Sequence, residues 1–191
     1  MSTASDSSAT SAPTNTVVTQ ESVVTSPLAR KVLAFGRIVI GFFFIWPFFD
    51  KLLGLGFTTP PERAWINGGT PAQGFLDNVD PAQPLAGLYQ TLFANPVGDF
   101  LFMFGLLGIG VSMIFGAGIR LGGVGGALLM LMMYLVSLPW IGEPTTNPIL
   151  DSHWIEGMLL LISAVTLAGD TWGLGRWWAN KEIVKKHGWL R

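Results

Sequence analysis

Five ionisable side chains lie at the ends of apolar segments, where they could take part in chemistry. Asp50 and Lys51 close the first apolar segment, Asp99 opens the second, and His153 and Glu156 begin the fourth. His153 and Glu156 are three residues apart, so on a helix they share one face. Because an unpaired charge is costly at membrane depth, we expect these groups to face one another or water.

This cluster has three interpretations. It could be a polar network that fixes the register of packed helices. It could bind a ligand, with Lys51 and His153 donating hydrogen bonds to a quinone carbonyl or a small anion and Glu156 accepting a proton. A metal site is the weakest interpretation, because one histidine among scattered carboxylates lacks the ligand spacing of zinc or non-haem iron. We therefore predict no metal. The catalytic residues stay unassigned, because the sequence has no nucleophile–base arrangement or phosphate-binding loop.

The elements that must position these residues are four apolar segments. Hydrophobic residues make up 50% of the chain and charged residues 12%, against about a quarter charged in soluble proteins. A membrane-spanning helix needs about 20 mainly apolar residues. We therefore predict an all-α integral membrane protein, a bundle of four transmembrane helices. The predicted helices cover residues 32–49, 100–119, 121–138 and 154–167.

The charged residues are sorted between the two ends of these segments. Of the 11 Lys and Arg residues, all but Arg37, Lys51 and Arg63 precede the first segment, separate the second from the third, or follow the fourth. Basic loops stay in the cytoplasm, so both termini are predicted to be cytoplasmic. Arg37 interrupts the first segment, where it could extend its head to the interface or act inside the bundle.

Composition excludes other classes of protein. The net charge is −1 and no basic stripe lies outside the flanks of the helices, which argues against a nucleic-acid partner. The chain has no cysteine, so disulfides and cysteine-ligated iron–sulfur clusters are excluded.

The segments outside the helices divide the chain further. Residues 1–28 are rich in Ser and Thr and are expected to form a disordered or partner-bound cytoplasmic tail. Residues 29–170 form the predicted membrane domain, whose long external loop, residues 56–96, contains an amphipathic helix near residues 84–95. Residues 171–191 are basic and rich in Trp, and we expect them to lie along the anionic inner leaflet.

Several short motifs follow one another along the chain. The first helix carries Arg37, Gly41 and a closing Lys51. The other motifs are Trp65-Ile66-Asn67-Gly68-Gly69, Gly74-Phe75-Leu76, Gly116-Ala117-Gly118-Ile119-Arg120-Leu121, Thr146-Asn147-Pro148 with Asp151 and His153, and Trp172-Gly173-Leu174-Gly175-Arg176-Trp177-Trp178. In this order the motifs resemble the DoxX-like family of membrane proteins. The chain departs from the family pattern in having no acidic residue within 100–119 and in having Gly175 where an aspartate is expected.

The resemblance implies a four-helix bundle that serves quinone-linked oxidoreductases, and its DoxD branch is associated with thiosulfate:quinone oxidoreductase. We expect an accessory subunit of a larger respiratory or redox complex, located in the plasma membrane among lipid and other membrane subunits. The alternative is a quinone-binding subunit of an oxidoreductase of the thiosulfate:quinone type, acting at the external mouth of the bundle. Whether the chain is an enzyme by itself stays open, and quinone is the one cofactor suggested. A transporter is less supported, because no internal repeat is visible.

Overall fold

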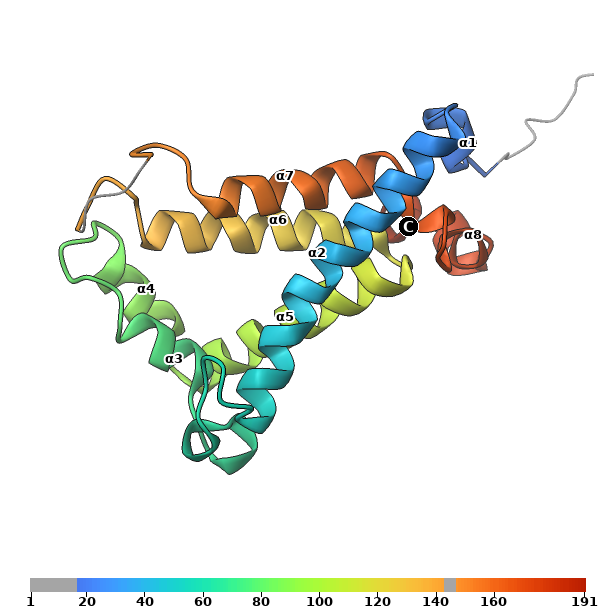
Figure 1. Ribbon diagram of the computed structural model, residues 1–191. Coiled ribbons are helices and arrows are strands. Elements are labelled where there is room, and N and C mark those ends of the chain that lie inside the picture. Colours follow the sequence, from blue (N-terminus) through green and yellow to red (C-terminus); the bar gives the residue numbers. More distant parts are fainter. Residues whose placement is uncertain (1–16, 143–146) are drawn as a thin grey trace, which may run out of the picture.

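The computed structural model describes residues 17–142 and 147–191, and within these ranges the chain forms helices and no strands. Residues 1–16 of the predicted tail, Glu143, and Thr146 of the family motif lie outside the described residues. Four long helices dominate (Figure 1). They are α2 (Pro27–Leu53), α5 (Pro96–Phe115), α6 (Ile119–Val136) and α7 (Ser152–Val165).

Three of the four long helices, α2, α5 and α6, are long and apolar enough to cross a membrane. The fourth, α7, is apolar but has 14 residues. At 1.5 Å per residue it is about 21 Å long, shorter than a hydrocarbon core of about 30 Å. The prediction of an all-helical membrane protein is therefore confirmed for three spans.

The ends of the long helices are set by local signals. Ser26 accepts a hydrogen bond from the Ala29 N–H at 3.3 Å and Pro27 follows it, which starts α2. Gly54, with φ of 67°, ends the same helix. Asn95 caps α5 by accepting from the N–H groups of Val97 and Gly98. These caps explain why the helices begin and end a few residues away from the limits that apolar content alone predicted.

The shorter elements lie at the two ends of the long helices. At the end that holds the first loop they are η1 (Pro61–Arg63), η2 (Trp65–Asn67), α3 (Pro71–Leu76) and α4 (Ala86–Phe93). At the other end they are α1 (Gln20–Val23), η3 (Ala168–Asp170), α8 (Gly175–Ala179), α9 (Glu182–Lys186) and η4 (Gly188–Leu190). Helix α4 falls within the helix predicted for residues 84–95.

The long helices form two pairs that together make a V (Figure 1). Helix α2 packs along α5, and α6 packs along α7. The pairs meet near α1 and α8 and diverge toward the other end, where α3 and α4 lie across the open side (Figure 1). Buried residues such as Phe44, Met113 and Leu160 form the main core. A second cluster, around Leu76 and Val136, joins the α3–α4 segment to the end of α6.

Glycines allow close approach within each pair. A Cβ at Gly110 of α5 would lie 2.9 Å from the Ile45 nitrogen of α2, and one at Gly123 of α6 would lie 2.8 Å from the Leu160 oxygen of α7. Both distances are too short for a side chain, so glycine is required at these two positions. At Gly108 and Gly125 an added Cβ would meet nothing within 4 Å. The glycine-rich faces therefore serve packing within the chain only in part.

Arg37 acts inside the helical assembly, although it lies in a membrane-spanning helix. Its side chain is fully buried and donates hydrogen bonds to the carbonyl oxygens of Ile114 at 2.8 Å, Trp172 at 3.1 Å and Ala168 at 3.2 Å, and also to that of Met113. Two of these carbonyls belong to the last turn of α5. The negative end of a helix dipole and free carbonyls stabilise a cation. Arg37 thus needs no carboxylate partner and joins α2 to α5 and η3.

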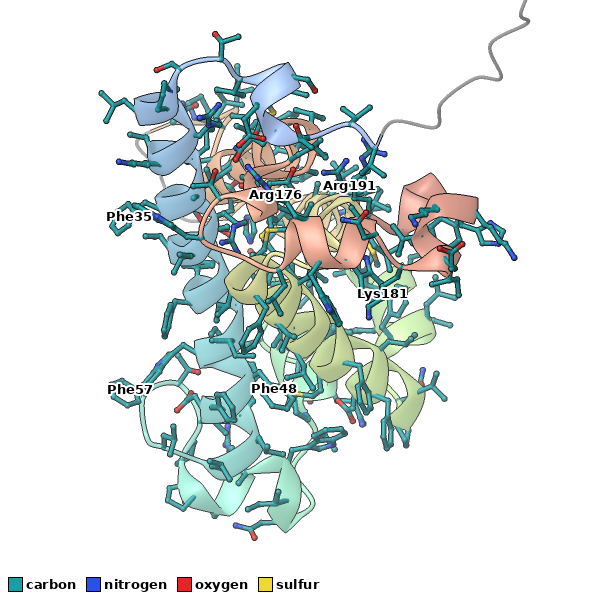
Figure 2. All side chains as sticks on the ribbon, turned by 90° about the vertical axis from the view of Figure 1, so that its right-hand side faces the viewer. Phe35, Phe48, Phe57, Arg176, Lys181 and Arg191 are labelled. Carbon is teal, nitrogen blue, oxygen red and sulfur yellow. The ribbon has the colours of Figure 1, made fainter. Side chains whose placement is uncertain are left out.

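A group of contacts that we call the terminal clasp gathers both ends of the chain where the helix pairs meet. Asp170 accepts hydrogen bonds from the Gln20 N–H at 2.9 Å and from Arg191 Nη2 at 2.8 Å. The Arg120 N–H donates to the Arg191 oxygen at 2.6 Å. Glu21 pairs with Arg176 at the surface, and Figure 2 shows Arg176 and Arg191 on this side of the molecule. Residues 17–24 are therefore held by the C-terminal segment.

The outer faces of the long helices are rich in large apolar side chains. Phe35 is 62% exposed and projects from the outer side of α2 (Figure 2). Leu101 of α5 and Val165 of α7 are similarly exposed. Such an extended apolar surface fits a lipid environment, in agreement with the predicted membrane location.

Candidate functional site

A cavity of about 790 Å³ lies between the two helix pairs near the end where they diverge; we call it the central cavity. Its inner wall is apolar and comes from three of the long helices, with Phe44 of α2, Phe102 of α5 and Met130 of α6 among its residues. Its outer part is polar. The ionisable residues that line it are Lys51, Glu62, Arg63, Asp77, His153 and Glu156.

Lys51 and Glu156 line the central cavity without side-chain partners in the described part of the chain. Lys51 is at the end of α2 and Glu156 is in the first turns of α7, and both are half-buried. Neither makes an ion pair or a side-chain hydrogen bond with a described residue. Half-buried charges without a hydrogen bond or ion pair are costly, so both groups are available to a ligand.

His153 is held in one orientation by Asp151. The ring Nδ1 lies 2.7 Å from one Asp151 carboxylate oxygen, and the other oxygen accepts the His153 N–H at 3.1 Å and caps α7. A carboxylate accepts, so Nδ1 carries the proton in this pair. The other ring nitrogen, Nε2, is left for a ligand in the central cavity, which His153 lines.

Asp50 does not line the central cavity, although it is next to Lys51. Its side chain is 1% exposed. Its carboxylate accepts from the Phe57 N–H at 3.1 Å, from the Thr58 N–H at 2.9 Å and from the Thr58 hydroxyl at 2.6 Å. Asp50 therefore folds the chain back after α2, and the carboxylate has no capacity left for a ligand.

Asp99 is also engaged elsewhere. It is buried and accepts hydrogen bonds from the Ala72 N–H at 2.7 Å, the Gln73 N–H at 3.3 Å and Gln73 Nε2 at 2.7 Å. These N–H groups belong to the first turn of α3, whose own N-cap residue, Thr70, makes no capping bond. Asp99 thus caps α3 from α5. Of the five predicted site residues, the structure brings Lys51, His153 and Glu156 to one cavity and separates Asp50 and Asp99 from it.

Three rim residues were missed by reasoning from the sequence. Glu62 and Arg63 of η1 and Asp77 after α3 reach the cavity because the first loop folds back over it. Pro60 and Pro61 mark a turn at this place, but no periodic pattern showed which way the loop returns. With Lys51 and Arg63 against Glu62, Asp77 and Glu156, the polar lining carries both signs, with one more negative charge than positive.

The excess of negative charge in the lining decides which kind of ligand the central cavity suits. An anionic head group would meet more negative than positive side chains. A neutral head group could accept a hydrogen bond from the Lys51 ammonium and donate one from a hydroxyl to His153 Nε2, while its apolar part contacted the inner wall. In the described residues, no group of three or more His, Cys, Asp or Glu side chains could hold a metal ion.

Comparisons of this chain with protein-family models, with curated proteins and with solved structures found no match in any of the three. The resemblance to the DoxX-like family stays a prediction that depends on the short motifs of the sequence.

Proposed function

We propose that this protein binds a quinone, a neutral ring with hydrogen-bonding oxygens on an apolar body, in the central cavity. One observation carries the proposal: Lys51, His153 and Glu156 have free hydrogen-bonding capacity around a cavity whose inner wall is apolar. Lys51 would donate to a quinone oxygen, and His153 Nε2, which carries no proton while Nδ1 donates to Asp151, would accept from a hydroxyl of the reduced form. Glu156 would accept from the hydroxyl of the reduced form, the quinol.

The proposal includes a membrane topology. Helix α7, continued by residues 166–170, forms the fourth span, and both termini are cytoplasmic. The first loop with α3 and α4 then lies outside the plasma membrane, and the central cavity opens at the external mouth. Two facts support this arrangement. The basic residues gather at the end that holds the terminal clasp, and α7 packs along α6, a helix long enough to span.

An accessory subunit of a larger respiratory or redox complex is the second candidate. A specific feature of the sequence favours it: the chain has no cysteine and so holds no cysteine-ligated cluster. Electrons for a bound quinone would then come from a partner subunit, for example one of the thiosulfate:quinone type. Purification in mild detergent should recover such a partner, and recovery of this chain alone would count against the second candidate.

Quinone binding is tested by equilibrium dialysis of the purified protein in detergent, with a short-chain benzoquinone as probe. We expect one bound quinone per chain. Lys51→Met should weaken binding of the quinone by about tenfold, and Glu156→Gln should weaken binding of the corresponding quinol, dialysed in parallel, by as much. Each change removes a hydrogen bond made by a charged group, about 1.5–3 kcal/mol. Lys31→Met is the matched control, since Lys31 is exposed at the other end of α2. Equal binding by all four proteins, or no binding by any, would overturn the proposal.

A further inference from the structure

A second cavity, of about 590 Å³, lies between α5 and α6; we call it the α5–α6 groove. Its lining is almost entirely apolar and runs along α5 from Gly98 to Ser112. This distance is about 21 Å at 1.5 Å per residue, most of the hydrocarbon thickness of a bilayer. Gly108 and Gly125 line the groove without side chains, and the space beside them is open: an added Cβ at either would meet nothing within 4 Å.

The α5–α6 groove adjoins the central cavity. Four residues line both: Phe75, Phe102, Leu129 and Met133. A single layer of side chains therefore separates a long apolar groove from a cavity with polar groups. Helices α5 and α6 belong to different pairs of the V, which diverge toward this region (Figure 1).

From this shared wall we infer that the α5–α6 groove holds the long prenyl tail of the quinone whose head occupies the central cavity, with the tail passing between the side chains that line both. The inference rests on the proposed function and narrows the ligand to a long-chain, lipid-soluble quinone. The gap between α5 and α6 would also be its path from the bilayer, since the tail never has to leave an apolar environment.

A transmembrane helix of a partner fits the groove less well. At the end near the central cavity the groove is closed by Tyr89 and Phe93 of α4 and by Leu76 of α3. A straight helix that crossed the whole bilayer would meet these elements, whereas a flexible chain can end or bend beneath them. The charge balance of the central cavity likewise disfavours a fatty acid or phospholipid, whose head is anionic.

The groove should provide room for the tail rather than binding free energy of its own. A tail that moves from lipid into the groove exchanges one apolar environment for another, so burial contributes little free energy. A filled groove, in contrast, would exclude the tail by steric overlap. The discriminating measurement therefore compares long-chain and short-chain quinones that have the same head.

The experiment uses the variant Gly108→Leu/Gly125→Leu, whose side chains enter open space in the groove. Gly36→Leu is the matched control in α2; its Cβ would lie 3.4 Å from the flexible end of Leu159, and it lines neither cavity. A labelled short-chain quinone reports the head site, and an unlabelled long-chain quinone competes with it. In the double variant we expect the short-chain affinity to be unchanged and the long-chain competitor to be weakened by at least about tenfold.

The outcomes separate the two proposals. No binding of the short-chain probe to the unsubstituted protein would overturn the proposed function itself. Normal short-chain binding, with equal long-chain competition in all three proteins, would overturn only the tail placement. If the double variant lost affinity for the short-chain and the long-chain quinone equally, the tail placement would also be overturned, because a filled groove should leave the head site intact.

A second measurement avoids substitutions and any question of folding. A long-chain quinone with a photoreactive group at the end of its tail is bound to the unsubstituted protein and irradiated. Cross-links to residues 101–112 or 118–129 are expected. Cross-links confined to the outer faces of α2 and α7, such as Phe35 and Val165, would overturn the inference.

Discussion

Asp50 and Lys51 show how two adjacent residues take different roles. Successive residues on a helix point about 100° apart. The Asp50 carboxylate turns to the loop and receives three hydrogen bonds from Phe57 and Thr58. The Lys51 ammonium lines the central cavity and, among the described residues, feels the charge of the neighbouring Asp50 but makes no hydrogen bond or close ion pair. One residue therefore supports the fold, and the other is free for a ligand.

This contrast predicts opposite effects of two substitutions. Asp50→Ala leaves two N–H groups and a hydroxyl without their acceptor and should lower the free energy of unfolding by about 1–3 kcal/mol. Lys51→Met should change it by no more than about 0.5 kcal/mol while weakening quinone binding. Unfolding in detergent, followed by circular dichroism, measures the first quantity. A larger loss of stability from Lys51→Met than from Asp50→Ala would contradict these roles.

Glu21 makes the terminal clasp sensitive to acid. Its pKa lies below the ordinary 4.5, chiefly because of a backbone hydrogen bond, with the Thr19 hydroxyl, Arg176 and Arg30 adding to the effect and partial burial opposing it. A pKa lowered on folding means that the ionised group stabilises the clasp above pH 4.5, and that this contribution is lost as the pH falls through the lower, folded value.

We therefore expect amide hydrogen exchange of residues 17–24 to become faster relative to the long helices when the pH falls below about 4.5. Glu21→Gln should remove this pH dependence, because an amide does not titrate, and should leave the exchange of α2 and α5 unchanged. If the acid response were the same in Glu21→Gln, another group would control the clasp.

At the scale of elements, α6 presents glycines to two different surroundings. Gly123 faces α7, where a Cβ would lie 2.8 Å from the Leu160 carbonyl oxygen and 2.7 Å from the Ala164 Cβ. Gly125, two residues later, faces open space on the groove side. The same residue type thus permits helix contact in one direction and leaves room in the other.

The same substitution at Gly123 and at Gly125 should lower the stability of the protein by different amounts. Gly123→Val forces α6 and α7 apart and should destabilise the protein by about 1–3 kcal/mol, as overpacking does. Gly125→Val should change stability by no more than about 0.5 kcal/mol. Thermal unfolding of both variants in one detergent makes the comparison. Similar melting temperatures for the two variants would contradict the close α6–α7 packing.

At the scale of the whole molecule, the proposed topology can be tested by labelling. The chain has no cysteine, so a single introduced cysteine is the only thiol present. Asn67→Cys lies in the first loop, Lys185→Cys lies in α9, and both positions are exposed. A membrane-impermeant maleimide should label Asn67→Cys on intact cells, and should label Lys185→Cys only after the membrane is opened.

In the proposed topology the two sites differ, because basic residues favour the cytoplasmic side and would keep the clasp end there. Labelling of Lys185→Cys on intact cells would reverse the orientation. Labelling of both sites from the outside would mean that the number of spans between them is even rather than three, and α7 would then not cross the membrane.

The sequence by itself determined the features that depend on local composition and on the bilayer. It predicted the helical class, the positions of the long apolar helices and the sorting of charges, because each follows from a short stretch of residues and its solvent. It also predicted that Lys51, His153 and Glu156 belong together, since all three lie at the same ends of the helices.

Only the tertiary structure decided which polar groups are free. Asp50 and Asp99 looked equivalent to Lys51 in the sequence, but the returning loop gives them hydrogen-bond donors from residues 57–58 and 72–73. Arg37 acts inside the protein because carbonyls of α5 and of residues after α7 converge on it. Such partners come from distant parts of the chain, and no local pattern specifies them. The divergence of the helix pairs, which creates the central cavity, likewise depends on how whole faces pack.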